Sequence, residues 1–143
     1  MNAELQENIF APEDVANHKA HAVCAYLHII IGLPLFLVPL LAAPDSRFAR
    51  FHGDQGLTHF LALFAGGLAW VLAGVLVLMF SFIPILGQIL GLIWILLGPC
   101  LLVFWYILGI LGIVNIAKGQ GKRLPLIGRW TILGPQGPPK NSA

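Results

Sequence analysis

The chain has 143 residues, of which 58% are hydrophobic and only 10% are charged. Soluble domains carry about 25% charged residues, so this composition excludes an ordinary water-soluble fold. The formal net charge of +2 is too small to indicate nucleic-acid binding.

Two long stretches, residues 20–44 and 55–117, contain no Asp, Glu, Lys or Arg. About 20 apolar residues in a helix cross a hydrocarbon core, so the first stretch predicts one span and the second at least two. We therefore expect an all-α integral membrane protein with three transmembrane helices; four spans are the alternative. The predicted layout is a polar segment over residues 1–17, one three-helix membrane domain over 18–130 and a disordered tail over 131–143.

The polar N-terminal segment contains a helix start at Pro12, which two acidic residues follow. Proline is favoured in the first helical turn, and acidic residues complement the helix dipole there. The first span is predicted over residues 20–41. Pro34 and Pro39 lie inside it, and we expect a kink there, since membrane helices tolerate proline where neighbours satisfy the freed carbonyl.

The second span follows a polar turn. Asp45 or Ser46 offers a side-chain cap for a helix that starts near Arg47, enters the hydrocarbon around Leu57 and continues to about Phe82.

The third span follows an uncharged turn over residues 83–87 and continues to Ala117. As one helix these roughly 30 residues would be about 45 Å long, more than a core of about 30 Å requires. A single long helix kinked at Gly98-Pro99 is favoured. Two short segments divided at that pair, the first re-entrant, are the alternative.

Cationic residues indicate the orientation. With three spans, the loop after the first span and the C-terminal tail share one side of the membrane, and only Lys19 lies on the other. The cations on the shared side are Arg47, Arg50, Lys118, Lys122, Arg123, Arg129 and Lys140. The positive-inside rule then predicts a multi-pass protein of the bacterial inner membrane, with the N-terminus outside and the C-terminus in the cytoplasm.

Two polar clusters on the predicted cytoplasmic side form the candidate site. We interpret them as a docking site for lipid head groups or a partner protein. Its residues are Arg50, His52, Asp54, Gln55, Lys118, Lys122 and Arg123. The alternative is that they only anchor the helix ends, because juxtamembrane cations are attracted to anionic lipid by about 1 kcal/mol each in any membrane protein.

The histidines fall into two groups: His18, His21 and His28 share one helix face, and His52 and His59 are seven residues apart. A transition-metal site or a proton relay could use such groups. Neither span contains a carboxylate, however, so we expect neutral histidines that form hydrogen bonds between helices. No metal and no other cofactor is predicted.

Glycines mark one face of the last span. At about 100° per residue, five of them fall on one narrow face: Gly87, Gly91, Gly98, Gly109 and Gly112. Close backbone approach drives helix association in lipid, so this stripe is predicted to pack against the second span; self-association is the alternative. Trp94 and Trp105 fall on the same face and are expected to fill the gaps.

The polar clusters also carry a resemblance. Arg-Phe-His-Gly-Asp-Gln-Gly-Leu at residues 50–57, Ala-Lys-Gly at 117–119 and Leu-Pro-Leu-Ile-Gly at 124–128 resemble a bacterial family of small membrane proteins of unknown function (domain of unknown function 4870). That family is distantly similar to the chloroplast protein-import component of the Tic complex. The likeness covers roughly residues 22–128.

Most bacterial members of that family have no assigned activity. On its composition together with this resemblance, we interpret the chain as a non-enzymatic inner-membrane protein that acts through partners, an accessory or scaffold subunit of a transport or protein-insertion system. A small channel or transporter is the alternative, although a conduction path needs a polar lining that the spans scarcely offer. The expected partners are membrane lipids and other membrane proteins, with homo-oligomers as a further option, and not nucleic acids.

Overall fold

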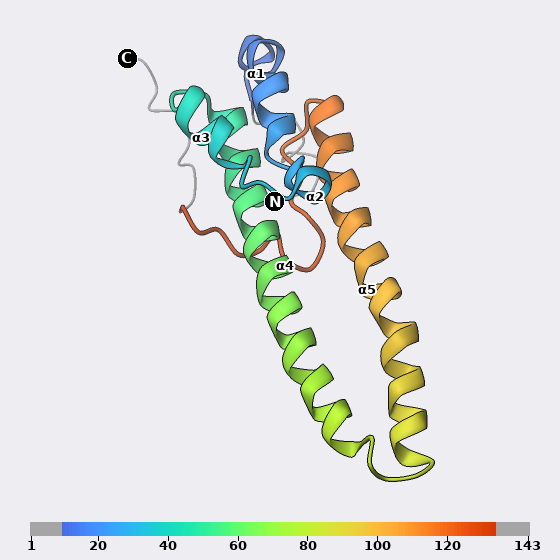
Figure 1. Cartoon of the computed structure of the whole chain (residues 1–143). Coiled ribbons are helices and arrows are strands. Elements are labelled where there is room, and N and C mark those ends of the chain that lie inside the picture. Colours follow the sequence, from blue (N-terminus) through green and yellow to red (C-terminus); the bar gives the residue numbers. More distant parts are fainter. Residues whose placement is uncertain (1–9, 134–143) are drawn as a thin grey trace. The chain divides into compact units, whose positions relative to one another are not determined.

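The computed structural model describes residues 10–133, which are helical or irregular and contain no strand (Figure 1), so the all-α prediction is confirmed for them. Two helices are long and apolar enough to cross a membrane: α4 (Arg47–Phe80) and α5 (Leu86–Ala117). A third such helix is absent from this part of the chain, so three spans are not shown. The predicted disordered tail lies outside the described residues from position 134 onward.

The chain divides into two compact units, and α4 and α5 contribute to both. Unit 1 contains the described residues up to Phe60 together with those from Leu108 onward. Unit 2 is Leu61–Ile107.

The stretch predicted to be the first span folds as short helices, so the single helix expected over residues 20–41 is wrong. The short helices are α1 (Pro12–Cys24), α2 (His28–Ile31) and α3 (Leu37–Ala42). Gly32 ends α2 in a left-handed conformation (φ +74°), and Pro34 has no N–H to continue a helix. None of the three approaches the roughly 20 residues that a span requires.

The start of α4 is capped from two directions in unit 1. The Ser46 hydroxyl oxygen accepts a hydrogen bond from the Ala49 N–H (3.0 Å), which confirms the predicted cap. Asp14 of α1 adds a carboxylate that accepts from the Ser46 hydroxyl (2.6 Å) and from the Phe48 N–H (3.0 Å). Partial burial opposes ionisation, but these bonds and the neighbouring His18 hold the pKa of Asp14 below its usual range. A negative charge at this helix end is favourable.

The core of unit 1 contains side chains from the segment after α1, from α4 and from α5. Its largest fully buried side chains include Tyr26, Phe48 and Ile116. Gly56 of α4 lies directly against the Ala25 carbonyl group, leaving no room for a Cβ atom. This close approach explains why α4 has glycine at that position.

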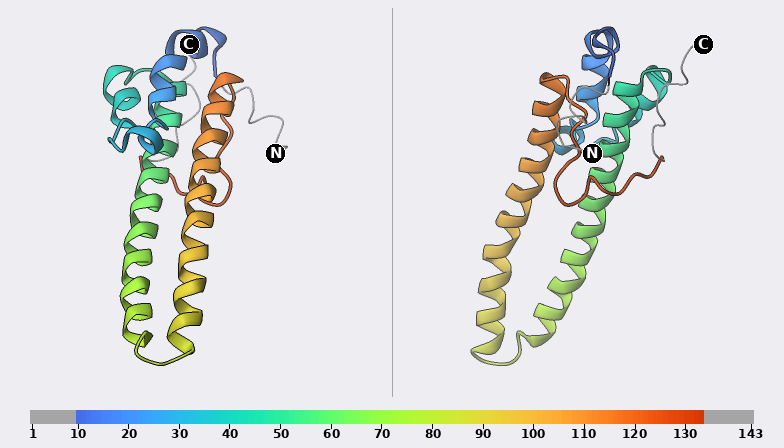
Figure 2. Two further views of the ribbon diagram at one scale, coloured as in Figure 1. Left: turned by 45° about the vertical axis from the view of Figure 1, so that its right-hand side comes forward. Right: turned by 180° about the vertical axis from the view of Figure 1, so that it is seen from behind.

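Unit 2 consists of the remaining parts of α4 and α5, which run antiparallel and side by side (Figure 2). Residues 81–85 form the turn between them, with Ile85 at φ +69°. Leu86–Ala117 is one continuous helix that contains Pro99, so the preferred single helix is confirmed and division at Gly98-Pro99 is not observed. The large apolar side chains of this unit are widely exposed.

Candidate functional site

The first turns of α4 carry a row of buried polar side chains that holds the chain beyond α5. The Gln55 amide donates to the Gly128 carbonyl (3.3 Å), and its oxygen accepts from the Leu124 N–H (3.2 Å). The Thr58 hydroxyl donates to the Trp130 carbonyl (3.0 Å). Asp54 completes the row. Its Oδ1 accepts from the N–H groups of Ile132 (3.0 Å) and Leu133 (2.8 Å).

These bonds bring together the two polar clusters that the sequence singled out. His52 adds another link, because its Nε2 donates to the carbonyl oxygen of Gln120 at 3.2 Å. The acceptors and donors on the C-terminal side are main-chain groups. The buried row therefore fixes the path of residues 120–133 across α4.

The seven predicted docking residues separate into two sets by exposure. The side chains of Arg50, Lys118, Lys122 and Arg123 are exposed, and they remain candidates for contact with lipid head groups. His52, Asp54 and Gln55 are at most 4% exposed. Because the buried three already bond to main-chain groups, they can orient a docking surface but cannot form its contact face.

A histidine pair joins α2 to α4. His28 Nδ1 lies 2.9 Å from the Ala25 carbonyl oxygen, which can only accept, so this nitrogen carries the proton. His28 Nε2 is then the acceptor for the His59 Nδ1–H at 2.9 Å. Phe36 and Phe60 pack edge-on against the His28 ring, and burial lowers the pKa of His28 despite the bond to Ala25. The predicted hydrogen bond between histidines of different helices is present in this pair.

Tyr26 and His52 are buried next to each other, with ring centroids 6.1 Å apart. The Tyr26 hydroxyl and His52 Nδ1 have no hydrogen-bond partner among the described residues. Burial raises the pKa of the Tyr26 phenol, and the negative charge of Asp54 raises it further, so the phenol stays protonated. Tyr26 lies in an apolar stretch of sequence, and no local signal identified it.

The part of the chain that the structure describes holds no group of three or more His, Cys, Asp or Glu side chains positioned to bind a metal ion. His28 and His59 bond to each other, and the Asp54 carboxylate is bonded to main-chain N–H groups. What these polar groups do is hold three segments of unit 1 in register. The exposed cations of unit 1 are therefore attached to segments whose positions these bonds fix.

The glycines of α5 have different surroundings along the helix. In unit 1, Gly109 and Gly112 lie against the side chains of Ile29 and Tyr26. In unit 2, a Cβ added to Gly98 would lie 3.2 Å from the Trp70 ring. Gly91 has no neighbouring heavy atom within 4 Å, so packing at that position stays a prediction.

The remaining residue of the stripe, Gly87, lies against the main chain of Phe80 and Ser81 at the turn between the helices. Glycine at this position therefore allows the main chain to approach closely at the turn. The predicted stripe thus has three kinds of surroundings: the turn, the helix pair of unit 2 and the core of unit 1.

Tryptophan side chains fill the space between α4 and α5 in unit 2. Trp70 and Trp94 stack, with ring centroids 3.5 Å apart and planes 15° from parallel. Trp94 also faces Gly74, and Trp105 faces Gly66. The helices thus meet through aromatic rings laid on glycine, where the sequence predicted close backbone approach.

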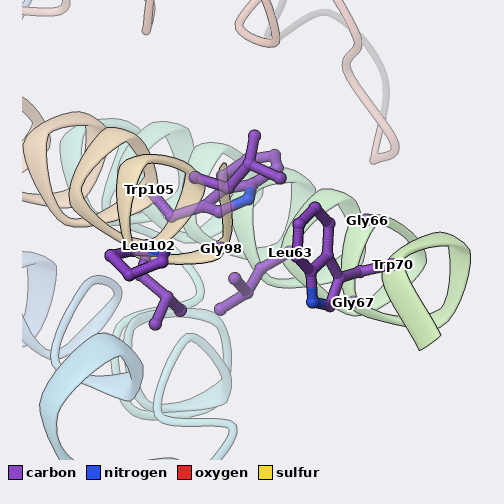
Figure 3. Close-up of a pocket in the computed structure, with 9 residues that line it drawn as sticks. Leu63, Gly66, Gly67, Trp70, Gly98, Leu102 and Trp105 are labelled. Carbon is purple, nitrogen blue, oxygen red and sulfur yellow. The ribbon is translucent and has the colours of Figure 1, made fainter. Parts of the chain in front are cut away.

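Beside these rings is an apolar cavity of about 290 Å³. Trp70, Trp105, Leu63 and Gly98 are among the residues that line it (Figure 3). The predominantly apolar lining has no charged group, which disfavours a path for ions.

Residues 17–131 match the magnetosome magnetite crystal formation protein family. No curated protein and no solved structure matches the chain. The family match contradicts the predicted resemblance to domain of unknown function 4870 and to the Tic component. That prediction is wrong. The motifs behind that resemblance include Gln55, Leu124 and Gly128, which bond to one another and so reflect how the chain folds. Because the match covers most of its length, the chain belongs to the magnetosome magnetite crystal formation protein family.

Proposed function

We propose that this protein is a non-enzymatic membrane protein of the magnetosome, where it acts in magnetite crystal formation. The observation that carries the proposal is the family match over residues 17–131. The two long apolar helices support a membrane location. The proposal replaces the accessory role in transport or protein insertion, which rested on the resemblance that the family match overturned.

We further propose a two-span hairpin with unit 1 on the cytoplasmic side. Contacts within unit 1 support this arrangement, because they join chain segments before α4 to segments after α5. For example, Val15 of α1 lies against Gly119, just beyond α5, and the Lys19 ammonium donates to the carbonyl oxygen of Ala117, the last residue of α5, at 3.0 Å. Segments joined in this way outside the bilayer lie on one side of it. The orientation predicted from three spans, with the N-terminus outside, is thereby replaced.

The distribution of cations supports the cytoplasmic side. All eight Lys and Arg residues lie outside residues 61–107, which form unit 2. A hairpin therefore collects them on one side, whereas three spans leave Lys19 on the other. By the positive-inside rule that side is the cytoplasm.

The same topology suggests how the protein acts on crystal formation. The turn over residues 81–85 would face the magnetosome interior, and residues 61–107 contain no carboxylate of the kind that binds hard cations. We infer that the protein does not hold the mineral through this turn. It acts from the membrane, through lipids or partner proteins that contact the exposed cations Arg50, Lys118, Lys122 and Arg123.

Deleting the gene in its magnetite-forming host tests the function. We expect crystals of altered size or number in electron micrographs, restored when the intact gene is supplied. Normal crystals in the deletion strain would refute the role in crystal formation.

The topology needs a separate test in sealed membrane vesicles whose outer surface is the cytoplasmic face. Cysteine variants at Phe82 and Lys118, made after replacing Cys24 and Cys100, should react differently with a membrane-impermeant maleimide. Equal accessibility of both positions from the cytoplasm would refute the hairpin.

A further inference from the structure

Residues 120–133 follow α5 as an irregular segment whose main chain is hydrogen-bonded to buried side chains. Gln55 and Thr58 bond to Leu124, Gly128 and Trp130. Loops on a water-exposed surface can satisfy their main-chain groups with water. A segment close to hydrocarbon cannot, and irregular structure persists there only where protein groups replace the water.

Side chains of this segment point both inward and outward. Leu124 and Ile127 are buried at 3% and 7% exposure and fix the segment to unit 1. In contrast, Leu126 is 75% exposed and Trp130 is 64% exposed. Moving two large apolar side chains out of water is favourable in proportion to the apolar surface that is covered.

Exposed cations flank these apolar side chains: Lys122, Arg123 and Arg129. Apolar side chains that alternate with Lys and Arg are typical of segments that lie in the membrane interface and bind anionic lipid. Tryptophan is enriched at the same depth. The exposed apolar residues of α2 and α3, such as Ile30 and Leu41, have no neighbouring cation in the sequence and lack this composition.

The bond between Thr58 and Trp130 indicates the depth of the segment. Thr58 lies three residues before Leu61, where the exposed apolar part of α4 begins. Three residues correspond to about 4.5 Å along a helix. The carbonyl group of Trp130 is therefore bonded to a residue that precedes the exposed apolar part of α4 by less than one helical turn along the chain.

We propose that residues 122–133 form an interfacial anchor that binds the anionic lipid surface on the side of unit 1. Leu126 and Trp130 lie among the upper acyl chains, and Arg123 and Arg129 contact lipid phosphates. The anchor rests on the proposed membrane location. It adds a defined lipid contact that the family match does not contain.

The test uses the full chain in nanodiscs, with Cys24 and Cys100 replaced by serine and a fluorophore attached at Thr131→Cys, which leaves Trp130 in place. Nanodiscs of phosphatidylcholine alone are compared with nanodiscs that also contain phosphatidylglycerol. We expect quenching by a nitroxide on the lipid head group to exceed quenching by a water-soluble nitroxide. The excess should be larger in the anionic nanodiscs.

Two charge variants of this labelled protein separate the anchor from general electrostatic attraction. Arg123→Gln with Arg129→Gln should abolish the gain from anionic lipid. Arg50→Gln with Lys118→Gln removes as much charge outside the segment and should lower that gain less, because the label reports only the lipid contact of the segment itself. All four side chains are exposed, so these variants should fold.

Stronger quenching from water than from lipid would overturn the proposal. So would protection that rises with the number of protein copies per nanodisc and not with anionic lipid, because a second copy would then cover the segment. The assay contains no mineral, so its failure leaves the role in crystal formation standing. Normal crystals in a deletion strain would likewise leave the anchor standing.

Discussion

Unit 1 and unit 2 are built from the same two long helices but are stabilised in different ways. In unit 1, α4 buries Asp54, Gln55 and Thr58, and each of them bonds to the main chain of residues 124–133. In unit 2, the helices contact each other through Trp rings that stack on each other or lie on glycine.

The difference shows which kind of contact determines the path of the chain in this membrane protein. Directional bonds from buried polar groups specify one path for the chain, whereas dispersion contacts between two apolar helices restrict it less. Substitutions of equal size should therefore have unequal effects in the two units.

Gly56→Ala should cause the largest loss. The added Cβ would overlap the carbonyl group of Ala25, and main-chain atoms cannot move aside as a flexible side chain can. We expect the free energy of unfolding to fall by about 3 kcal/mol, measured by denaturant titration in mixed micelles with circular dichroism. Gly67→Ala, on α4 in unit 2, is the control because no heavy atom lies within 4 Å of that site. Equal stability of the two variants would refute the close approach.

Asp54→Ala should have the next largest effect, about 2 kcal/mol, because two main-chain N–H groups lose their acceptor. Limited proteolysis should show earlier cleavage after Arg129 as the segment detaches. Asp54→Asn keeps one acceptor oxygen and should be milder. Asp45→Ala removes an exposed carboxylate from the same unit and should change nothing. If Asp54→Ala resists cleavage as well as the original protein, the segment is held by other contacts.

The sequence predicts those elements whose signals are local. Pro12 with its acidic neighbours marked the start of α1, and Ser46 marked the start of α4. The uncharged stretch up to Ala117 indicated one long helix. Each signal depends on residues within a turn or two of the element that it predicts.

The broken first span was not predictable in the same way. An apolar stretch such as residues 20–41 has one composition whether lipid or protein surrounds it, and membrane helices tolerate Pro34 and Pro39. His28 decides the outcome through a bond to His59, 31 residues further along the chain. Similarly, the sequence suggested that Asp54 was a docking residue. Its actual partners are the main-chain N–H groups of residues 132 and 133. Every residue type except proline has such a group, so the sequence does not reveal this bond.

Lowering the pH should weaken unit 1 by a smaller amount. Burial lowers the pKa of His28, so the unfolded chain binds a proton at a higher pH than the folded chain does. The contribution of neutral His28 to the free energy of unfolding is therefore fully present above about pH 6.5, the usual pKa of histidine. Below it, this contribution falls by at most about 1.4 kcal/mol per pH unit until His28 also titrates in the folded state.

Unfolding midpoints measured between about pH 7.5 and pH 5 test this dependence. His28→Gln removes this titrating ring and should make the curve less steep. A smaller slope remains, because burial also lowers the pKa of His52, to about 3. The variant starts from a lower stability because the contact with His59 changes. Among the described groups, His59, Phe36 and Phe60 face the His28 ring. An unchanged slope in His28→Gln would assign the pH dependence to another group.

Gly91→Leu should have the smallest effect, below about 0.5 kcal/mol, since no heavy atom lies within 4 Å of that position in unit 2. Gly109→Leu, on the same helix in unit 1, should be clearly destabilising because Ile29 already occupies the space, with Cδ1 2.6 Å from an added Cβ. Sedimentation in detergent should give the same molecular mass for Gly91→Leu as for the original protein. A lower mass, or a loss of stability as large as that of Gly109→Leu, would mean that another helix covers Gly91, and self-association through the glycine stripe would then explain its periodicity.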